Sequence, residues 1–384
     1  MSLNYFSIME AADKEMTHSA MLRFLLHNAP PVLALFSPFV RHENALRVSL
    51  EETRKTGNNK RARFDLVARS GGQTLVVENK FKSFPTAAQL KRYDDVLRGV
   101  KDDFPNPVKY LLCFDTAALA GLVETNKANS WHTIGYDDIR AAVSRWLDGE
   151  GRNAPLETRV LCEHYVRFLE AYCATFLAVH EDYSLAFCSQ DEQAAARRES
   201  DETVVLSAEE SARPAGDPNF WQTLVLHQVG LMLEKRFVYK CGDTARKAIA
   251  EERLIVHSQG ASATPNMNIQ PPDWLDANGR DFQVCIQIQG QEMKLYIKGL
   301  KNETVRTDAV AYAQMLNGLI QREWNEPEAK MSAHTKSSNS FYVYKDVDSL
   351  LKGKTSVADL SNKIWEFYQR TDKIVQAVKH SQKL

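Results

Sequence analysis

The sequence lacks the short motifs that mark several large classes of enzyme. It contains no Gly-x-x-x-x-Gly-Lys-Ser/Thr loop for cradling phosphates, no Gly-x-Ser-x-Gly nucleophile turn and no His-Glu-x-x-His zinc motif. Each of these motifs sets a catalytic group or a phosphate-binding backbone on a particular turn or helix face. Their absence argues against a small-molecule enzyme of those classes.

Cysteine is sparse and scattered along the chain. The six cysteines lie between residues 113 and 285, and no two of them form a Cys-x-x-Cys pair. Structural zinc sites and disulfide frameworks show close, repeated cysteine spacings, so neither is expected here. Scattered reduced thiols are typical of a cytoplasmic protein.

Long apolar runs and an excess of one charge are also missing. No run reaches the roughly 18 apolar residues of a membrane-spanning helix. Residues 1–16 lack the basic and apolar regions of a secretion signal. The 48 lysines and arginines balance 49 aspartates and glutamates, which leaves a net charge of −1. We expect a cytoplasmic globular protein in which any contact with nucleic acid comes from a local basic patch.

What the sequence does contain is a hairpin signal over residues 63–82, RFDLVARSGGQTLVVENKFK. Two apolar, strand-forming runs flank the Gly-Gly pair at 71–72, which is a strong signal for a two-residue turn. With this turn, the register places Asp65 directly opposite Glu78. Lys80 shares their face because side chains alternate along a strand.

This register predicts two carboxylates facing each other among apolar neighbours. Like charges in opposite positions destabilise a sheet, and desolvation increases the cost. A divalent cation between Asp65 and Glu78 would remove the repulsion, because hard cations such as Mg²⁺ bind carboxylate oxygens. The alternative is that both acids lie on the solvated face of an edge hairpin, with Lys80 as a surface partner.

Two predicted helices flank the hairpin along the chain. Residues 7–28 have a broad apolar face, and Glu15 and His18 lie three residues apart on one side of it. Pro85 opens a second helix that runs to about residue 100 and presents Gln89 and Tyr93 on one face. Glu15 could point at the hairpin carboxylates as a further metal or water ligand, or it could belong to a solvated helix.

Positive charges gather around the same hairpin. They precede it in a short loop, and they follow it in the second helix. Such charges beside the carboxylates could bind phosphates, which supply much of the affinity for nucleic acid; the alternative is a solvated turn. The candidate phosphate contacts are Lys60, Arg61, Arg63, Lys82 and Arg92.

Taken together, these motifs resemble the PD-(D/E)XK nuclease superfamily, in particular its RecB-like and uncharacterised bacterial members. The resemblance rests on Asp65, on the segment Glu78-Asn79-Lys80 that ends an apolar strand, and on the Gln-x-x-x-Tyr helix at 89–93. The segment EMTHS at 15–19 is similar to the helix that these families carry before the hairpin. One departure is that Phe64, rather than proline, precedes Asp65, which the superfamily tolerates.

The resemblance implies a restriction-endonuclease-like α/β core in the order α-β-β-β-α-β, with helices flanking a central mixed sheet. It also implies hydrolysis of phosphodiester bonds, usually of DNA, with Mg²⁺ or in its place Mn²⁺ as cofactor. The implied metal ligands are Asp65, Glu78 and Glu15. Lys80 would orient or help deprotonate a water, or neutralise the scissile phosphate, while Gln89 and Tyr93 would position backbone or water.

The chain is long enough for two domains. We expect a nuclease-like domain over residues 1–187, an acidic linker over 188–218 and a second α/β domain over 219–384. The second domain has no recognised acid cluster, so we expect it to serve specificity, partner binding or dimerisation. Residues 282–298 repeat the spacing of 64–80, which leaves open a degenerate second copy of the hairpin.

Two classes of function are left open by the sequence. The first is a metal-dependent deoxyribonuclease. The second is a catalytically silent nuclease-fold module that binds nucleic acid or a partner protein. Silent members of the superfamily usually lose an acid or the lysine, so the presence of Asp65, Glu78 and Lys80 favours the enzyme. The choice between endo- and exonuclease stays open.

Overall fold

The computed structural model describes the parts of the chain that carry its helices and strands. The described residues are 5–8, 14–39, 46–55, 61–81, 85–114, 116, 131–182, 229–258, 266–274, 282–290, 292–326, 340–346 and 355–381. By their contacts they form two compact units, of which the first ends within a long helix at Leu177 and the second includes all described residues from 229 onward. The predicted linker and both predicted domain boundaries fall outside these residues. No described helix is long and apolar enough to cross a membrane.

The first unit contains a five-stranded mixed sheet in the order β1-β2-β3-β4-β5. The first three strands are antiparallel neighbours, and β4 and β5 run parallel to β3. Their bounds are β1 Arg47–Lys55, β2 Arg61–Ser70, β3 Gln73–Lys80, β4 Pro107–Cys113 and β5 Trp131–Gly135. The apolar segment at 108–113 is buried as expected for a central parallel strand.

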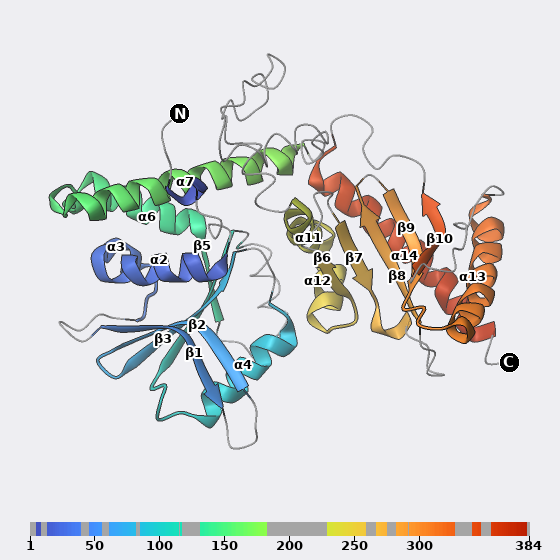
Figure 1. Cartoon of the computed structure of the whole chain (residues 1–384), viewed down its shortest axis with the longest axis horizontal. Helices are drawn as coiled ribbons and strands as arrows, with labels where there is room; N and C mark the ends of the chain where they lie inside the picture. The colour runs from blue at the N-terminus through green and yellow to red at the C-terminus, as the bar shows by residue number, and fades with distance from the viewer. Residues whose placement is uncertain are drawn as a thin grey trace, which may run out of the picture. The chain divides into compact units, whose positions relative to one another are not determined.

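Helices cover both faces of this sheet. One face is covered by a group of helices whose apolar side chains form a single core with the strands (Figure 1). These helices are α2 Glu15–Asn28, α3 Pro30–Ala34, α6 Tyr136–Asp148 and α7 Leu156–Glu181, and the short α1 Tyr5–Ile8 packs on α7. The other face is covered by α4, Ala87–Gly99, which begins two residues after Pro85 because Thr86 caps it.

The hairpin between β2 and β3 has the register predicted from the sequence. Ser70 pairs with Gln73, and the ladder continues in step to Leu66 and Val77. Gly71 and Gly72 both have positive φ, at 54° and 77°. This conformation matches the right-handed twist of the strands and favours glycine at both positions.

The second unit contains a five-stranded antiparallel sheet in the order β10-β9-β8-β7-β6. Its strands are β6 Ile255–Ser258, β7 Asn266–Gln270, β8 Gln283–Gln289, β9 Glu292–Lys298 and β10 Ser340–Asp346. Its helices are α11 Val229–Lys240, α12 Gly242–Ala250, α13 Glu303–Trp324 and α14 Val357–Ser381. The expected α/β class is confirmed for both units, although α12 and β7 were not predicted. A five-residue strand with two asparagines has little strand propensity.

The two hairpins are not related in the way that their spacing suggested. Gln289 pairs with Glu292, just as Ser70 pairs with Gln73. When the two hairpins are aligned by their turns, the alignment shifts by one residue from the one that the sequence spacing suggested. Val284 then corresponds to Asp65, and Val284 lies on the opposite face from Gln283. The first sheet is also mixed, whereas the second is antiparallel throughout. The described strands therefore give no support to a duplicated hairpin.

The first prediction concerns the turn of the β2–β3 hairpin. We expect Gly72→Ala to lower the stability of the first unit by about 1–2 kcal/mol, because an L-residue is strained at this positive φ. Thermal unfolding monitored by circular dichroism measures the change. Gly318→Ala, in the exposed interior of α13 with open space around it, is the control and should raise stability by about 0.5–1 kcal/mol. Equal effects of the two substitutions would contradict this account.

Candidate active site

Asp65 is held at the point where β2 and β3 separate. The last recorded backbone pair of the two strands is Leu66 with Val77. At the next position the Asp65 Oδ2 atom accepts a hydrogen bond from the backbone N–H of Asn79, at 2.8 Å. The Asp65 side chain thus bonds to a backbone N–H of β3 that would otherwise be free to pair with a strand, and this bond fixes the carboxylate beside the end of β3.

The strand is distorted at this position. Leu66 belongs to the core under α2 and α6, yet Phe64 packs its ring on Tyr93 and Phe104, on the side of α4. Residues two apart on a regular strand share one face. Glu51, which lies across from Asp65 in β1, has a left-handed φ of 49°. Such backbone strain is found most often at functional sites.

Glu78 is buried at the centre of the site, with 1% of its surface exposed. Its Oε1 atom accepts hydrogen bonds from Lys80 Nζ at 2.6 Å, Gln89 Nε2 at 2.8 Å and the Tyr93 hydroxyl at 3.2 Å. Its Oε2 atom is buried and has no hydrogen-bond partner. One oxygen of this carboxylate is therefore crowded with donors, while the other is left for a further ligand.

The first turns of α4 supply two of these donors. The Thr86 side chain accepts the backbone N–H of Gln89, which starts the helix at the open end of β3. Gln89 and Tyr93 are one turn apart, and Gln89 Nε2 also donates to the Tyr93 hydroxyl at 3.0 Å. The predicted pairing of these two side chains on one helix face is thus observed, and both point at Glu78.

Burial and repulsion shift the protonation of the two carboxylates. Desolvation raises the pKa of Glu78 to about 7, and the nearby charge of Asp65 adds to the rise, while Lys80 opposes it. Burial likewise raises the pKa of Asp65. Burial alone would lower the pKa of Lys80, but Glu78, Glu15 and Asp65 outweigh it, and the pKa of Lys80 is raised. The ammonium group is therefore fully charged at neutral pH.

Glu15 lies at the first residue of α2, half-buried beside the same site. Its negative charge raises the pKa of both Asp65 and Glu78, so its side chain is within electrostatic reach of them. Among the described residues, however, no three His, Cys, Asp or Glu side chains are gathered closely enough to bind one metal ion. As the side chains stand, Glu15 is a neighbour of the carboxylate pair, and its predicted role as a metal ligand stays a prediction.

The structure adds roles for two side chains that sequence reasoning missed, those of Asn79 and Tyr136. The Asn79 side chain points to the opposite face of β3, where its Nδ2 atom donates to the carbonyl of Glu15 at 2.8 Å and to Ser19 at 3.2 Å. Its Oδ1 atom accepts from the buried Tyr136 hydroxyl at the start of α6. Strand alternation could have shown that this amide faces an apolar layer and needs partners.

His18 takes no part in the carboxylate site. It is fully buried, stacks on Phe81 with ring centroids 3.7 Å apart, and shares a hydrogen bond with the Tyr165 hydroxyl at 3.1 Å. The part of the EMTHS segment that contains His18 is therefore a core contact, while Glu15 and Ser19 connect α2 to the site through Asn79.

The predicted phosphate contacts are only partly placed. Arg61 and Arg63 are exposed at the start of β2, and Arg63 forms an ion pair with Glu51 at 3.4 Å. Arg92 is exposed on α4, with its guanidinium group 5.7 Å from the centre of the Tyr93 ring. The other two predicted contacts, Lys60 and Lys82, lie outside the described residues.

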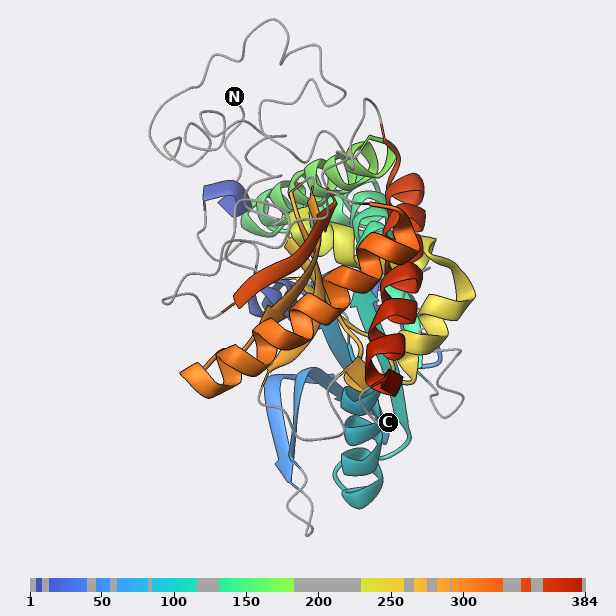
Figure 2. The ribbon, with the colours of Figure 1, turned by 90° about the vertical axis from the view of Figure 1, so that its right-hand side faces the viewer.

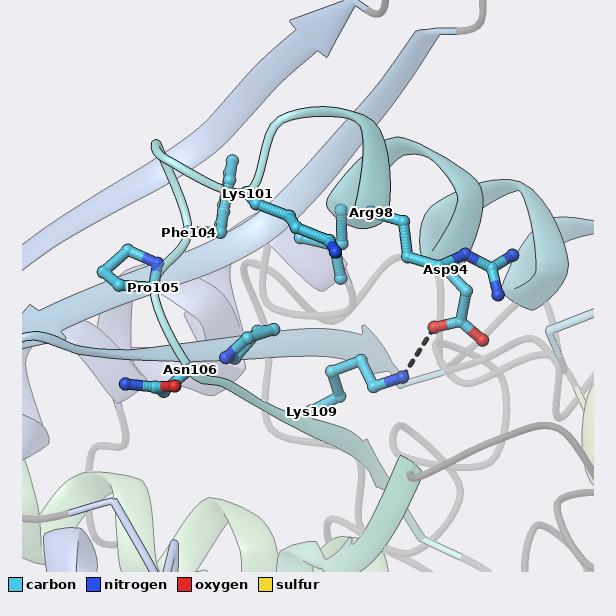
Figure 3. Close-up of a pocket in the computed structure, with 9 residues that line it drawn as sticks. Asp94, Arg98, Lys101, Phe104, Pro105, Asn106 and Lys109 are labelled. Carbon is cyan, nitrogen blue, oxygen red and sulfur yellow. Dashed lines mark hydrogen bonds and ion pairs between the residues drawn. The ribbon is translucent and has the colours of Figure 1, made fainter.

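A separate cavity of about 550 Å³ lies at the other end of α4, away from the carboxylates. Figure 3 shows Asp94 and Lys109 on its floor, and their ion pair measures 2.7 Å. Asp94 Oδ1 also accepts the indole N–H of Trp131 at 3.1 Å, and the Trp131 ring lies 6.3 Å from that of Tyr93. Asp94 is thus connected through Trp131 to the ring of Tyr93, whose hydroxyl bonds to Glu78.

The second prediction concerns the pH dependence of stability without metal. A native pKa of about 7 for Glu78, above its ordinary 4.5, means that the folded state binds more protons than the unfolded state in this range. Stability should therefore fall as the pH rises from about 4.5 to about 7. Urea unfolding in EDTA measures it, and Glu78→Gln should flatten the profile. Glu157→Gln, at an exposed position on α7, is the control and should show the same pH profile as wild type. Parallel profiles for wild type and Glu78→Gln would contradict the raised pKa of Glu78.

Comparison with known proteins bears on the same segment. No curated protein and no solved structure matches the chain. A family model described as the PD-(D/E)XK nuclease superfamily matches residues 32–165, which include β1 to β5 and α4. The resemblance inferred from the hairpin is therefore confirmed. The segment 32–165 is thus similar to the PD-(D/E)XK nuclease superfamily, as the hairpin motifs indicated.

Proposed function

We propose that the chain is a metal-dependent nuclease that hydrolyses phosphodiester bonds of DNA at Asp65, Glu78 and Lys80. The superfamily match suggests a nuclease-type function. The observation that carries the proposal is the buried Glu78 carboxylate, with one unpartnered oxygen and a pKa near 7, close to Asp65 and bonded to Lys80. A purely structural ion pair would not need a second acid at the same place.

The donor set fits a hard divalent cation. The free Oε2 atom of Glu78 and the Asp65 carboxylate are oxygen ligands of the kind that Mg²⁺ and Mn²⁺ prefer. A positive ion there would also relieve the repulsion that raises both pKa values. When bound, such an ion supplies an activated water and stabilises negative charge on the phosphate in the transition state.

Lys80 has the properties of a charge-neutralising group. Its ammonium is buried and forms an ion pair with Glu78 at 2.6 Å, and its pKa is raised. A lysine that holds its proton at neutral pH is a poor general base. Of the roles considered from the sequence, we therefore favour neutralisation of the phosphate over deprotonation of a water.

Gln89 and Tyr93 orient the central carboxylate. Both donate to Oε1 of Glu78, which leaves Oε2 as the only oxygen of this group without a hydrogen bond. Removing one donor should therefore loosen the carboxylate without removing a ligand. Arg61, Arg63 and Arg92 are exposed nearby and suited to bind phosphates of the substrate.

The second candidate is a catalytically silent module that binds nucleic acid or a partner. It does not account for a buried acid pair whose pKa values stay raised although Lys80 compensates part of the repulsion. We also propose that residues 1–187 form a restriction-endonuclease-like domain, joined by the acidic segment 188–218 to a domain over 219–384.

The third prediction tests hydrolysis directly. Wild type with Mg²⁺ should cleave DNA, and Asp65→Asn and Glu78→Gln should each reduce the rate by about 10²-fold or more, because each removes an anionic oxygen from the site. Gel assays on labelled DNA measure the rate. Asp102→Asn, in the exposed turn after α4, is the control and should cleave like wild type. Full activity of Asp65→Asn would refute the proposed site.

The fourth prediction separates metal binding from folding. Asp65→Asn should be as stable as wild type in EDTA, or more stable by about 1 kcal/mol, because it removes the repulsion between the acids. Saturating Mg²⁺, at about 100 times its Kd, should stabilise wild type by about 2.7 kcal/mol and leave Asp65→Asn nearly unchanged. Melting curves with EDTA and with Mg²⁺ decide this. No shift of wild type in Mg²⁺, together with a lower Tm of Asp65→Asn in EDTA, would indicate a structural role instead.

A further inference from the structure

One face of the second sheet is composed almost entirely of polar and tyrosine side chains. Strand pairing places these residues together, since Gln287 pairs with both Lys294 and Asn268, and Tyr296 pairs with Tyr342. Residues directly opposite each other, or two apart on one strand, share a face. We call this the polar face, and its main residues are Asn268, Gln287, Lys294, Tyr296, Lys298 and Tyr342.

The other face of the same sheet carries the apolar core of the unit. Tyr344, after the bulge in β10, packs its ring on Trp324 of α13 and Phe367 of α14, with centroids 5.1 and 6.1 Å apart. Figure 1 shows α14 passing behind the strands, and Figure 2 shows it on one side of them. The contacts of these two helices therefore assign them to the apolar face.

The polar face is positively charged. Lys294 and Lys345 both pair with the single carboxylate of Glu292, and Lys298 donates to the neutral amide of Gln270 at 3.3 Å. Among the described residues of this face, three lysines against one glutamate leave a net charge of +2. His257 adds no charge at neutral pH, because burial and Lys298 lower its pKa. A polyanion complements such a surface.

A buried donor beneath this face has no partner. Asn268 is fully buried, and its Oδ1 atom accepts from the Tyr296 hydroxyl at 3.2 Å and from Gln287 at 3.4 Å. Its Nδ2 atom has no hydrogen bond. Leaving such a donor unsatisfied is unfavourable, so it points to a ligand that supplies an acceptor.

The chemistry of the face matches an unpaired nucleic-acid strand. Lysines bind phosphates, amides such as Gln287 hydrogen-bond to base edges, and tyrosines such as Tyr342 stack on bases. Five strands about 4.8 Å apart form a surface roughly 19 Å wide. This is wider than the roughly 12 Å major groove, which admits only a helix or a two-stranded ribbon. A duplex therefore cannot present its bases to the polar face.

We propose that the polar face of the second sheet binds a single-stranded DNA segment, with Lys294 and Lys298 on phosphates and Tyr342 stacked on a base. The choice of DNA rests on the proposed nuclease function, whereas binding of a single strand rests on the face itself. The second unit thereby contributes substrate selection, favouring DNA that carries an unpaired stretch.

The test measures binding without cleavage. Full-length Asp65→Asn in EDTA is titrated into a fluorescent 20-nucleotide single strand at several salt concentrations, and anisotropy is recorded. Adding Lys294→Gln and Lys298→Gln should weaken binding about tenfold or more and reduce the slope of log K against log salt by about 1.4, or about 0.7 for each phosphate contact. The matched control is the double variant Lys373→Gln with Lys379→Gln, on α14, which should change neither the affinity nor the salt slope.

A second variant tests stacking. Tyr342→Leu keeps an apolar side chain on β10 but removes the ring, and it should weaken binding by roughly 5- to 150-fold with an unchanged salt slope. Melting curves show whether each variant is folded. Equal binding by the lysine variant and its control overturns the proposal, as does tighter binding of duplex DNA or of the same sequence as RNA. If wild type with Mg²⁺ does not cleave DNA but still binds the single strand, the proposed nuclease function is refuted, while the proposed binding surface is supported.

Discussion

The buried carboxylate of Glu78 is the constraint on which the rest of the first unit depends. A charged or half-titrated acid at 1% exposure is unfavourable unless it is surrounded by donors and counter-charge. Lys80, Gln89 and Tyr93 supply these on one oxygen only. This leaves one oxygen of Glu78 without a partner, and the pKa values of Glu78 and of its neighbour Asp65 are both raised.

The fold meets this constraint by using both faces of a single strand. Even-numbered residues at the end of β3 face α4 and form the site, while Asn79 faces the other way and ties β3 to α2 and α6. Because the amide of Asn79 is bonded on three sides, the end of β3 is fixed in space relative to the N-terminus of α2. This brings the charge of Glu15 within electrostatic reach of the two carboxylates.

Part of the fold and of the candidate site could be predicted from the sequence, because it depends on the short-range repeats of strands and helices. The Gly-Gly turn and the two-residue repeat of strands were enough to give the hairpin register from Ser70–Gln73 to Leu66–Val77, and the helical repeat was enough to pair Gln89 with Tyr93. The short strand β7 was missed because its asparagines are buried by tertiary packing, which overrides their low strand propensity. Asn79 was missed as a structural link because its partners are distant in sequence.

The sequence by itself determined the resemblance to the superfamily and the hairpin register, since both follow from residue type and spacing. It also supplied the two acids and the lysine of the proposed site. Only the tertiary structure decided which oxygen of Glu78 is occupied, that Lys80 holds its proton, and that the second sheet has one polar face. These properties depend on burial and on contacts between segments far apart in the chain. Burial sets pKa values and leaves donors unsatisfied, and no local pattern of residues encodes it.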